Sequence, residues 1–171
     1  PYTTLFRSVG GAYDDGVAYR FVSKLDGLYN VEVENAEFRF AKDWKAYVPY
    51  VIKMEENTIE AQYVSSFENT YEHHPLSEWE KGRLAFLPLI VEADNGMKVC
   101  IVESDFLDYP GMFLHNDNGS STLKANFAPH PKEVIQGGHN MLQGMIQSRE
   151  SFIAKAEGKT DRKSTRLNSS H

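Results

Sequence analysis

Cysteine is almost absent from this sequence, because Cys100 is the only one among 171 residues. A single cysteine excludes an intrachain disulfide framework and a cysteine-rich zinc site. Basic residues are also scarce: 18 Lys and Arg stand against 24 Asp and Glu, which leaves a net charge of −6. This acidic balance argues against nucleic acids and anionic membrane surfaces as partners. No apolar run approaches the ~20 residues of a membrane-spanning helix.

The short motifs that mark many enzymes are missing as well. The sequence contains no HExxH-type histidine pair, no GxSxG elbow, no phosphate-binding loop and no GxGxxG run. His73 and His74 are adjacent, and neighbouring residues of a strand point to opposite faces. We therefore interpret this pair as solvated side chains and not as a metal site. His115, His130 and His139 are isolated in the sequence.

The two ends differ in origin from the rest of the chain. Pro1–Ser8 (PYTTLFRS) and Asp161–His171 (DRKSTRLNSSH) correspond, codon for codon, to translations of the two partner adapters used in DNA sequencing. We expect both ends to be translated adapter and exclude them from the protein proper, as one would a fusion scar. Residues 9–160 then form one partial domain, more acidic than the whole chain. The alternative is a natural basic tail, which genomic DNA encoding both ends would establish.

What the sequence does contain is a series of short apolar segments separated by turns. Asn95-Gly96 joins the apolar run 84–91 to 97–103, and Asn-Gly between apolar runs is the strongest short-range hairpin signal. Asn118-Gly119 is a second such turn, between 112–115 and 122–127. Many short strands at regular spacing predict an all-β fold, a β-sandwich.

Other segments give weaker signals. Asp26-Gly27 predicts a hairpin turn after the strand 17–22. Because proline cannot donate to a strand ladder, Pro49 predicts that 46–54 is an edge strand or a loop. Residues 59–64 are predicted to form a further extended segment. Residues 67–80 are interpreted as a long surface loop with one helical turn near Ser77. For 141–156 we favour strand over helix.

The segment Val99–Leu114 (VCIVESDFLDYPGMFL) carries the most informative chemistry. It predicts a strand that ends at Glu103, followed by Asp105, Asp108 and a turn at Tyr109-Pro110-Gly111. One interpretation is an ordinary strand with a solvated acidic turn. The other is a carboxylate presented by a rigid sheet to a ligand or a hard cation. Ca²⁺ takes about six to eight oxygens, so this loop alone offers too few ligands.

Four stretches resemble the N-terminal domain of glycoside hydrolase family 97: AYDDGVAYRF (12–21), the strand 34–40, the block 84–114, and FIAKAEG (152–158). The block is the most specific, since the family pattern is similar to E-A-D-L-x-D-Y-P-G-M after a strand. Ser104 stands where Ala is usual, and Phe106 where Leu is usual. The resemblance implies a supersandwich-type β-domain, here incomplete, that precedes a (β/α)₈ catalytic barrel.

The same resemblance implies a function for the parent protein. Members are exo-acting, calcium-dependent α-glycosidases that remove terminal α-linked glucose or galactose. Their catalytic carboxylates lie on the barrel, so none is expected in this chain, and the fragment alone should be inactive. Glu103 matches the glutamate that this domain contributes to a Ca²⁺ site at the barrel interface. The expected partners are an α-linked glycoside and the intramolecular barrel, with no nucleic acid and no membrane. The family implies a periplasmic or secreted location.

Two other functions stay open at this point. One is a non-catalytic carbohydrate-binding sandwich, in which exposed Trp44, Trp79 or Tyr71 stacks on sugar rings. The other is a structural docking domain with a broad apolar patch around 84–89 or 112–114.

Overall fold

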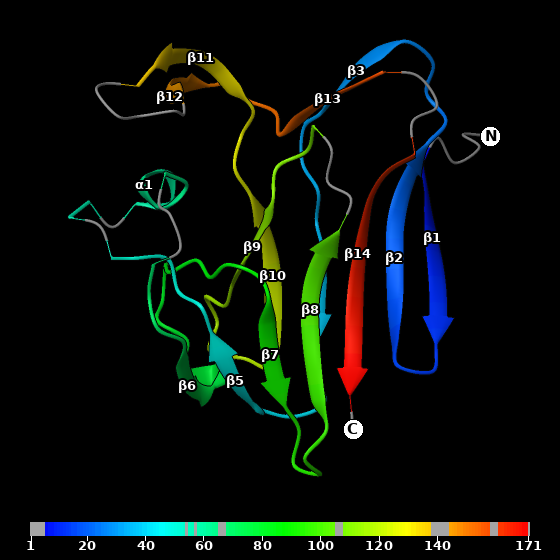
Figure 1. The fold of residues 1–171 in the computed structure, drawn as a ribbon, viewed down its shortest axis with the longest axis vertical. Coiled ribbons are helices and arrows are strands. Elements are labelled where there is room, and N and C mark those ends of the chain that lie inside the picture. The colour runs from blue at the N-terminus through cyan, green and yellow to red at the C-terminus, as the bar shows by residue number, and fades with distance from the viewer. Residues whose placement is uncertain are drawn as a thin grey trace.

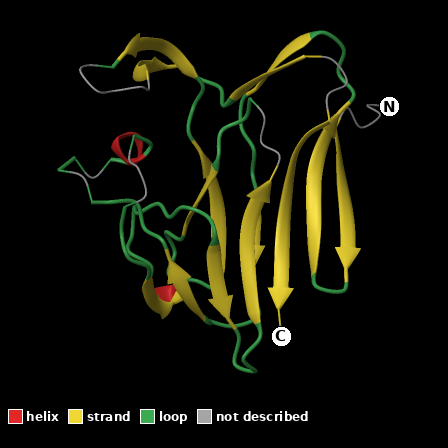
Figure 2. Cartoon of the chain, viewed as in Figure 1, coloured by secondary structure: helices red, strands yellow, loops and turns green. Residues whose placement is uncertain are grey.

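The chain is a two-layer β-structure with almost no helix (Figures 1 and 2). The computed structural model describes residues 6–53, 55–56, 58–64, 68–104, 108–137, 144–157 and 161–170, with the backbone alone for 6–7 and 161–170. The predicted all-β sandwich is confirmed. Within the described residues, no helix is long and apolar enough to cross a membrane.

The larger layer is a seven-stranded antiparallel sheet in the order β1-β2-β14-β8-β7-β5-β6. Its strands are β1 (Phe6–Tyr13), β2 (Gly16–Ser23), β5 (Lys45–Val48), β6 (Glu72–Pro75), β7 (Leu89–Glu92), β8 (Lys98–Ser104) and β14 (Asp161–Ser170). Figure 1 shows β14, in red, between β2 and β8. A strand made of the C-terminal segment thus lies inside the sheet and not at its edge.

The second layer is a three-stranded antiparallel sheet in the order β4-β10-β9, and two strand pairs lie at one end of the molecule. The sheet is built from β4 (Glu37–Arg39), β9 (Met112–His115) and β10 (Thr122–Phe127). The pairs are β11 (Pro131–Gln136) with β12 (Gly144–Arg149), and β13 (Ala154–Glu157) with β3 (Leu28–Val31). The described helical segments are α1 (Ile59–Gln62) and the 3₁₀ turn η1 (Leu76–Glu78).

The hydrophobic core lies between the two layers. The larger sheet contributes Val91 and Ile101, and the smaller one contributes Leu114 and Leu123, all fully buried. Ala85 joins the layers, because its backbone exchanges two hydrogen bonds with that of Leu114, at 2.8 and 2.9 Å. The alternation of apolar residues along each strand supplies these inward-facing side chains.

Both Asn-Gly hairpin predictions are confirmed. β7 pairs with β8 across Asn95-Gly96, and β9 pairs with β10 across Asn118-Gly119. Gly96 and Gly119 adopt φ values of 82° and 59°, which side chains disfavour. The preference for strand over helix in 141–156 is also confirmed where the structure describes it, by β12 and β13.

Three local predictions are wrong in whole or in part. Gly27 adopts a positive φ of 76°, but β3 pairs with β13 and not with β2, so no hairpin forms there. The prediction of an edge strand or loop for 46–54 is partly right. Residues 46–48 belong to β5, which lies between β6 and β7 and is not an edge, whereas the strand ends before Pro49, which has no N–H to donate. Residues 59–62 are helical because the Thr58 hydroxyl caps the Ala61 N–H at 3.2 Å.

The interpretation of 67–80 as a surface loop is only partly right. The helical turn near Ser77 exists as η1, but β6 pairs with β5 immediately before it. Leu76 is fully buried and Trp79 is 5 % exposed, so this segment forms part of the core. The segment was predicted to be exposed because most of its residues are polar, although two of its side chains are buried.

Candidate functional site

A cleft of about 790 Å³ opens at the end of the sandwich where β8 stops. Its walls come from the ends of β8 and β9, from the connection between β10 and β11, and from β12. The apolar lining includes Phe86, Leu87, Pro88, Met112, Phe113 and Ile153, and the polar lining includes Tyr63, Glu103, Asp108, Tyr109, His130 and Arg149. Apolar walls with a few placed polar groups are typical of a ligand-binding site.

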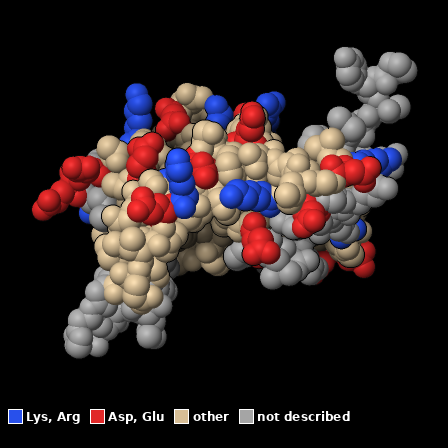
Figure 3. Space-filling view, turned by 90° about the horizontal axis from the view of Figure 1, so that it is seen from above, with Lys and Arg blue, Asp and Glu red and all other residues tan. Residues whose placement is uncertain are grey.

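The surface at this end of the molecule carries charges of both signs. Figure 3 shows acidic and basic side chains interspersed across the part of this face that the structure describes.

Glu103 lies at the end of β8, on the same strand face as the buried Ile101, and is half-buried itself. Its Oε2 accepts a hydrogen bond of 2.6 Å from the Met112 N–H at the start of β9. The carboxylate therefore links the two sheets and also lines the cleft. Gly111 lies beside this carboxylate. A Cβ at this position would lie 3.8 Å from Oε2, so there is space between them.

Tyr109 is a second polar group beside Glu103. Its hydroxyl donates to Glu34 Oε2 at 2.6 Å, across 75 residues of sequence. Burial, the Glu34 carboxylate and the Glu103 carboxylate raise the pKa of Tyr109 far above its ordinary value. The hydroxyl consequently stays protonated and remains a hydrogen-bond donor in this acidic corner.

Cationic and aromatic groups line the opposite wall of the cleft. Arg149 donates from Nη1 to the Pro129 carbonyl at 2.7 Å, and its guanidinium lies 5.5 Å from the centre of the Tyr63 ring. The Tyr63 hydroxyl donates to Asn126 Oδ1 at 2.5 Å, and His130 stacks on Phe152. The described lining of the cleft thus includes the carboxylates of Glu103 and Asp108 and the guanidinium of Arg149 among mostly apolar groups.

The other acidic and histidine candidates are dispersed. Asp108 lines the cleft, exposed, with φ 53°, a left-handed conformation that Asp tolerates. Asp105, Phe106 and His139 lie outside the described residues. Among the residues that the structure describes, no group of three or more His, Cys, Asp and Glu is placed to hold a metal ion.

The adjacent histidines His73 and His74 contact different partners, as expected for neighbouring residues of a strand. His73 stacks on Tyr47 at 4.1 Å, whereas the half-buried His74 lies 3.1 Å from the Tyr50 hydroxyl. His74 is therefore not simply solvated, and its ring belongs to a polar network. His115 instead lies beside Asp117, with 2.8 Å between Nδ1 and Oδ2.

The proposed aromatic sugar platform receives little support. Trp79 is buried and donates from Nε1 to the Arg83 carbonyl at 2.9 Å, so its prediction as an exposed stacking residue is wrong. Trp44 is half-buried against the core. Tyr71 is exposed, yet its hydroxyl donates to the Pro88 carbonyl.

The apolar docking patch is also largely internal. Leu84, Leu89, Met112 and Leu114 are buried within the fold. Side chains between them, such as Phe86 and Phe113, face the cleft. The alternation of the strands divides these runs between core and cleft.

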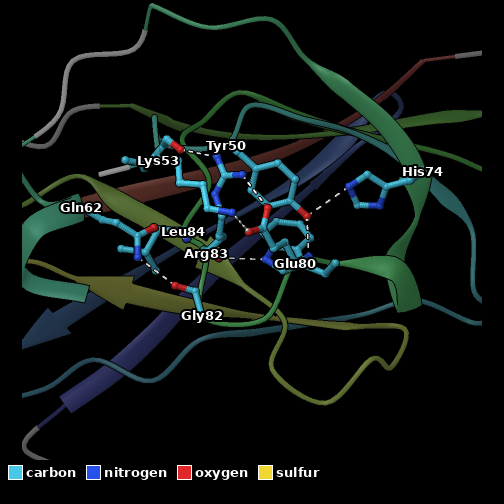
Figure 4. A network of polar contacts seen from close by, with 10 residues as sticks. Tyr50, Lys53, Gln62, His74, Glu80, Gly82, Arg83 and Leu84 are labelled. Atoms are coloured by element: carbon cyan, nitrogen blue, oxygen red, sulfur yellow. Dashed lines mark hydrogen bonds and ion pairs between the residues drawn. The ribbon is translucent and has the colours of Figure 1, made fainter. Parts of the chain in front are cut away.

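A polar network is centred on the buried side chains of Tyr50 and Arg83 (Figure 4). The Arg83 guanidinium sits 4.5 Å from the centre of the Tyr50 ring, donates from Nη2 to the Val51 carbonyl at 2.5 Å and pairs with Glu80 at 2.7 Å. The Tyr50 hydroxyl accepts from the Glu80 N–H at 2.9 Å, and burial raises the pKa of Tyr50 to about 12. These groups join three chain segments and have a structural role.

Glu80 makes this network sensitive to acid. The hydrogen bond from Arg83, with a further one from Lys53, holds the pKa of Glu80 below its usual value of 4.5. A lowered folded-state pKa stabilises the fold above pH 4.5, and this stabilisation is lost as the pH falls through the folded-state pKa.

We therefore expect Glu80→Gln to flatten the acid limb of stability. The urea midpoint of the unmodified chain should fall between about pH 7 and roughly pH 3, and that of the variant should fall less. Glu133→Gln, on exposed β11, serves as the control and should retain the full dependence. Identical pH profiles for the chain and for Glu80→Gln would contradict this account.

Sequence reasoning identified Glu103 but not the groups around it. Glu34, Tyr63, His130 and Arg149 come from four separate segments, and nothing local in the sequence brings them together. The Pro and Gly content of 129–138 predicts a loop, and that prediction is wrong for 131–136, which form β11.

Comparison with known proteins gives consistent results. Residues 8–154 match the family model described as glycosyl-hydrolase 97 N-terminal. A retaining alpha-galactosidase from Bacteroides thetaiotaomicron is 44 % identical over 146 residues, which cover 85 % of this chain and 22 % of that protein.

Solved structures agree on the fold. A variant of a glycoside hydrolase family 97 enzyme from Pseudoalteromonas sp. strain K8, and the enzyme from the same source in complex with acarbose, each superpose with a TM-score of 0.66 at 16 % identity. Each match covers 96 % of this chain and 21 % of the other. The chain therefore spans about a fifth of the length of these relatives.

Proposed function

Because the chain belongs to glycoside hydrolase family 97, we propose that it forms part of the N-terminal domain of an exo-acting α-glycosidase that releases terminal α-linked galactose. The 44 % identity to a retaining alpha-galactosidase supports galactose over glucose and retention of the anomeric configuration. The distant structures, including the acarbose complex, support the fold alone.

The observation that carries the site proposal is the position of Glu103. The rigid end of β8 holds its carboxylate at the wall of the cleft, and the Met112 N–H fixes one of its oxygens. A carboxylate oriented in this way is suited to bind a hard cation at the junction with another domain.

The residues present fit a partial calcium site. Glu103 supplies carboxylate oxygen, the donor type that Ca²⁺ prefers, but Ca²⁺ takes about six to eight oxygens. The other ligands would come from the catalytic domain. A bound Ca²⁺ would supply fixed positive charge next to the sugar hydroxyls. Tyr109, protonated beside the two carboxylates, would keep a donor directed at Glu34 throughout.

Catalysis itself is assigned to residues outside this chain. Glycoside hydrolysis requires a pair of carboxylates, about 5–5.5 Å apart in retaining enzymes. Glu103 at the cleft instead accepts from the Met112 N–H, and Glu34 accepts from Tyr109. We expect the present chain to show no hydrolysis of 4-nitrophenyl α-galactoside, and the intact protein to hydrolyse it in preference to the α-glucoside.

Glu103→Gln in the intact protein tests the calcium role. The glutamine oxygen can still accept from the Met112 N–H, so the link between the sheets survives while the negative charge is removed. We expect weaker Ca²⁺ binding by calorimetry, at least about tenfold, and a fall in kcat, since a charged ligand of the cation contributes ~1.4 kcal/mol or more.

The matched control is Glu133→Gln, an identical change on the exposed strand β11 at a residue that is not among those lining the cleft. It should leave Ca²⁺ affinity and turnover unchanged. If Glu103→Gln binds Ca²⁺ as tightly as the parent, and a chelator affects both equally, then Glu103 serves only to join β8 to β9.

A further inference from the structure

The position of β14 in the larger sheet is unexpected for its sequence. β14 is hydrogen-bonded on both sides, antiparallel to β2 across 161–168 and to β8 across 164–170. Figure 1 shows it running opposite to both neighbours. It is therefore a central strand that connects the β1–β2 hairpin to the rest of the sheet.

Three observations indicate that β14 stands in for another strand. The family match ends at residue 154, before β14 begins. Its ten residues, DRKSTRLNSS, fall in the segment that we expect to be translated adapter, and Leu167 is the single apolar residue among them. Central strands facing a core normally carry apolar residues at alternate positions.

A hollow of about 350 Å³ adjoins both neighbours of β14. The described residues that line it include Val17 of β2, Val99 of β8 and Phe38 of β4, together with the charged Glu37 and Arg39. In the register, Leu167 is opposite Val17 and Ile101, and Ser169 is opposite Val99. A small polar residue thus occupies the register position opposite an apolar residue that lines this hollow.

The two neighbours cannot simply close the gap. Both run antiparallel to β14, so β2 and β8 are parallel to each other, and direct contact would require parallel pairing in an antiparallel sheet. Left open, the gap would expose two rows of unpaired N–H and C=O groups.

We propose that, in the intact protein, the position between β2 and β8 is filled by a strand of the same polypeptide from outside residues 9–157, antiparallel to both. The occupant is a strand and not a peptide ligand, because the chain spans only about a fifth of its relatives and the polypeptide itself has ample length to supply it. It carries apolar residues at the register positions of Leu167 and Ser169. This inference rests on the sheet and the family match, and it stands independently of the calcium role of Glu103.

The native Cys100 makes the arrangement testable by crosslinking. In the intact protein translated from the uninterrupted gene, Gly16→Cys places a second thiol in register with Cys100, with one strand between them. Two inter-strand spacings separate the Cα atoms by about 9.5 Å, beyond the ~7 Å limit for a disulfide. We expect no disulfide between the introduced thiol and Cys100 after oxidation, as mapped by mass spectrometry.

Ile90→Cys is the matched control with the same native thiol. Ile90 and Cys100 are direct partners in β7 and β8, so this disulfide should form readily. A Gly16→Cys crosslink as efficient as the control would show that β2 and β8 are adjacent, and would overturn the proposal.

Hydrogen exchange supplies the positive result. In the intact monomer, the amides of 17–22 and 98–104 should exchange as slowly as those of β10, which is central in its own sheet. Fast exchange of both segments would mean an open gap. Protection that appears only in a dimer, by sedimentation, would mean that a second copy fills it; either result overturns the proposal.

The present 171-residue chain tests the apolar requirement. Ser169→Leu should raise the melting temperature by a few degrees, because its register position lies at the hollow beside Val99. Ser170→Leu, one position along and on the opposite face, should not. Equal effects of the two changes would contradict the predicted apolar character of the occupant.

Discussion

Replacing Arg83 with Leu is expected to lower the free energy of unfolding by about 3–5 kcal/mol. Arg83 is 5 % exposed, and its guanidinium donates to the buried Val51 carbonyl, pairs with Glu80 and stacks on Tyr50. The leucine side chain leaves the Val51 carbonyl without this donor and removes the cation–π contact, and each loss is costly in a desolvated setting.

Urea denaturation followed by tryptophan fluorescence measures this effect, since Trp79 is buried beside Arg83 and reports on the same region. Arg39→Leu is the matched control: Arg39 also forms an ion pair with a nearby glutamate, Glu37, but its side chain is 76 % exposed. Exposed pairs contribute about 0–1 kcal/mol. A comparable loss for the two arginines would show that the Tyr50–Arg83 network contributes little.

Leu114→Ala should cost about 3–5 kcal/mol of stability. Leu114 is fully buried in β9, between the two sheets, and its backbone is bonded to Ala85 in both directions. Truncation removes apolar contacts and leaves a cavity. The two sheets, each held rigid by its own hydrogen bonds, cannot move closer to each other to fill it.

Leu28→Ala provides the contrast, because Leu28 is 81 % exposed in β3. The same chemical change there should alter the unfolding free energy by less than about 0.5 kcal/mol. Both variants are measured in urea, with the slope of the transition checked for constancy. A loss below about 1 kcal/mol for Leu114→Ala would mean that the β9 layer is loosely packed.

The parts of the fold that sequence predicted share a local cause. The hairpins at Asn95-Gly96 and Asn118-Gly119 depend on positive φ at a glycine within a few residues of both strands. The errors have the opposite character. β3 pairs with β13, more than a hundred residues along the chain, and no local turn signal encodes that partner. Thr58 precedes α1 and caps it, a local signal that the prediction of an extended segment at 59–64 did not consider.

The candidate site divides in the same way. A strand that ends in Glu103 is a local pattern, and its place on the Ile101 face follows from period-two alternation. The contact between Glu34 and Tyr109, and the wall formed by Tyr63 and Arg149, join distant segments that become neighbours only when the sheets pack.

The sequence by itself determined the all-strand architecture, the family and the glutamate at the end of β8. Each depends on residues that are close together in the sequence: alternating apolar residues, turn residues and a contiguous motif. Only the tertiary structure decided that this glutamate joins two sheets at a cleft, that Trp79 is internal, and that β3 pairs with β13. Those facts depend on which segments bury one another, and backbone hydrogen bonding accepts almost any strand of suitable length and direction, so residue identity alone does not specify the partner.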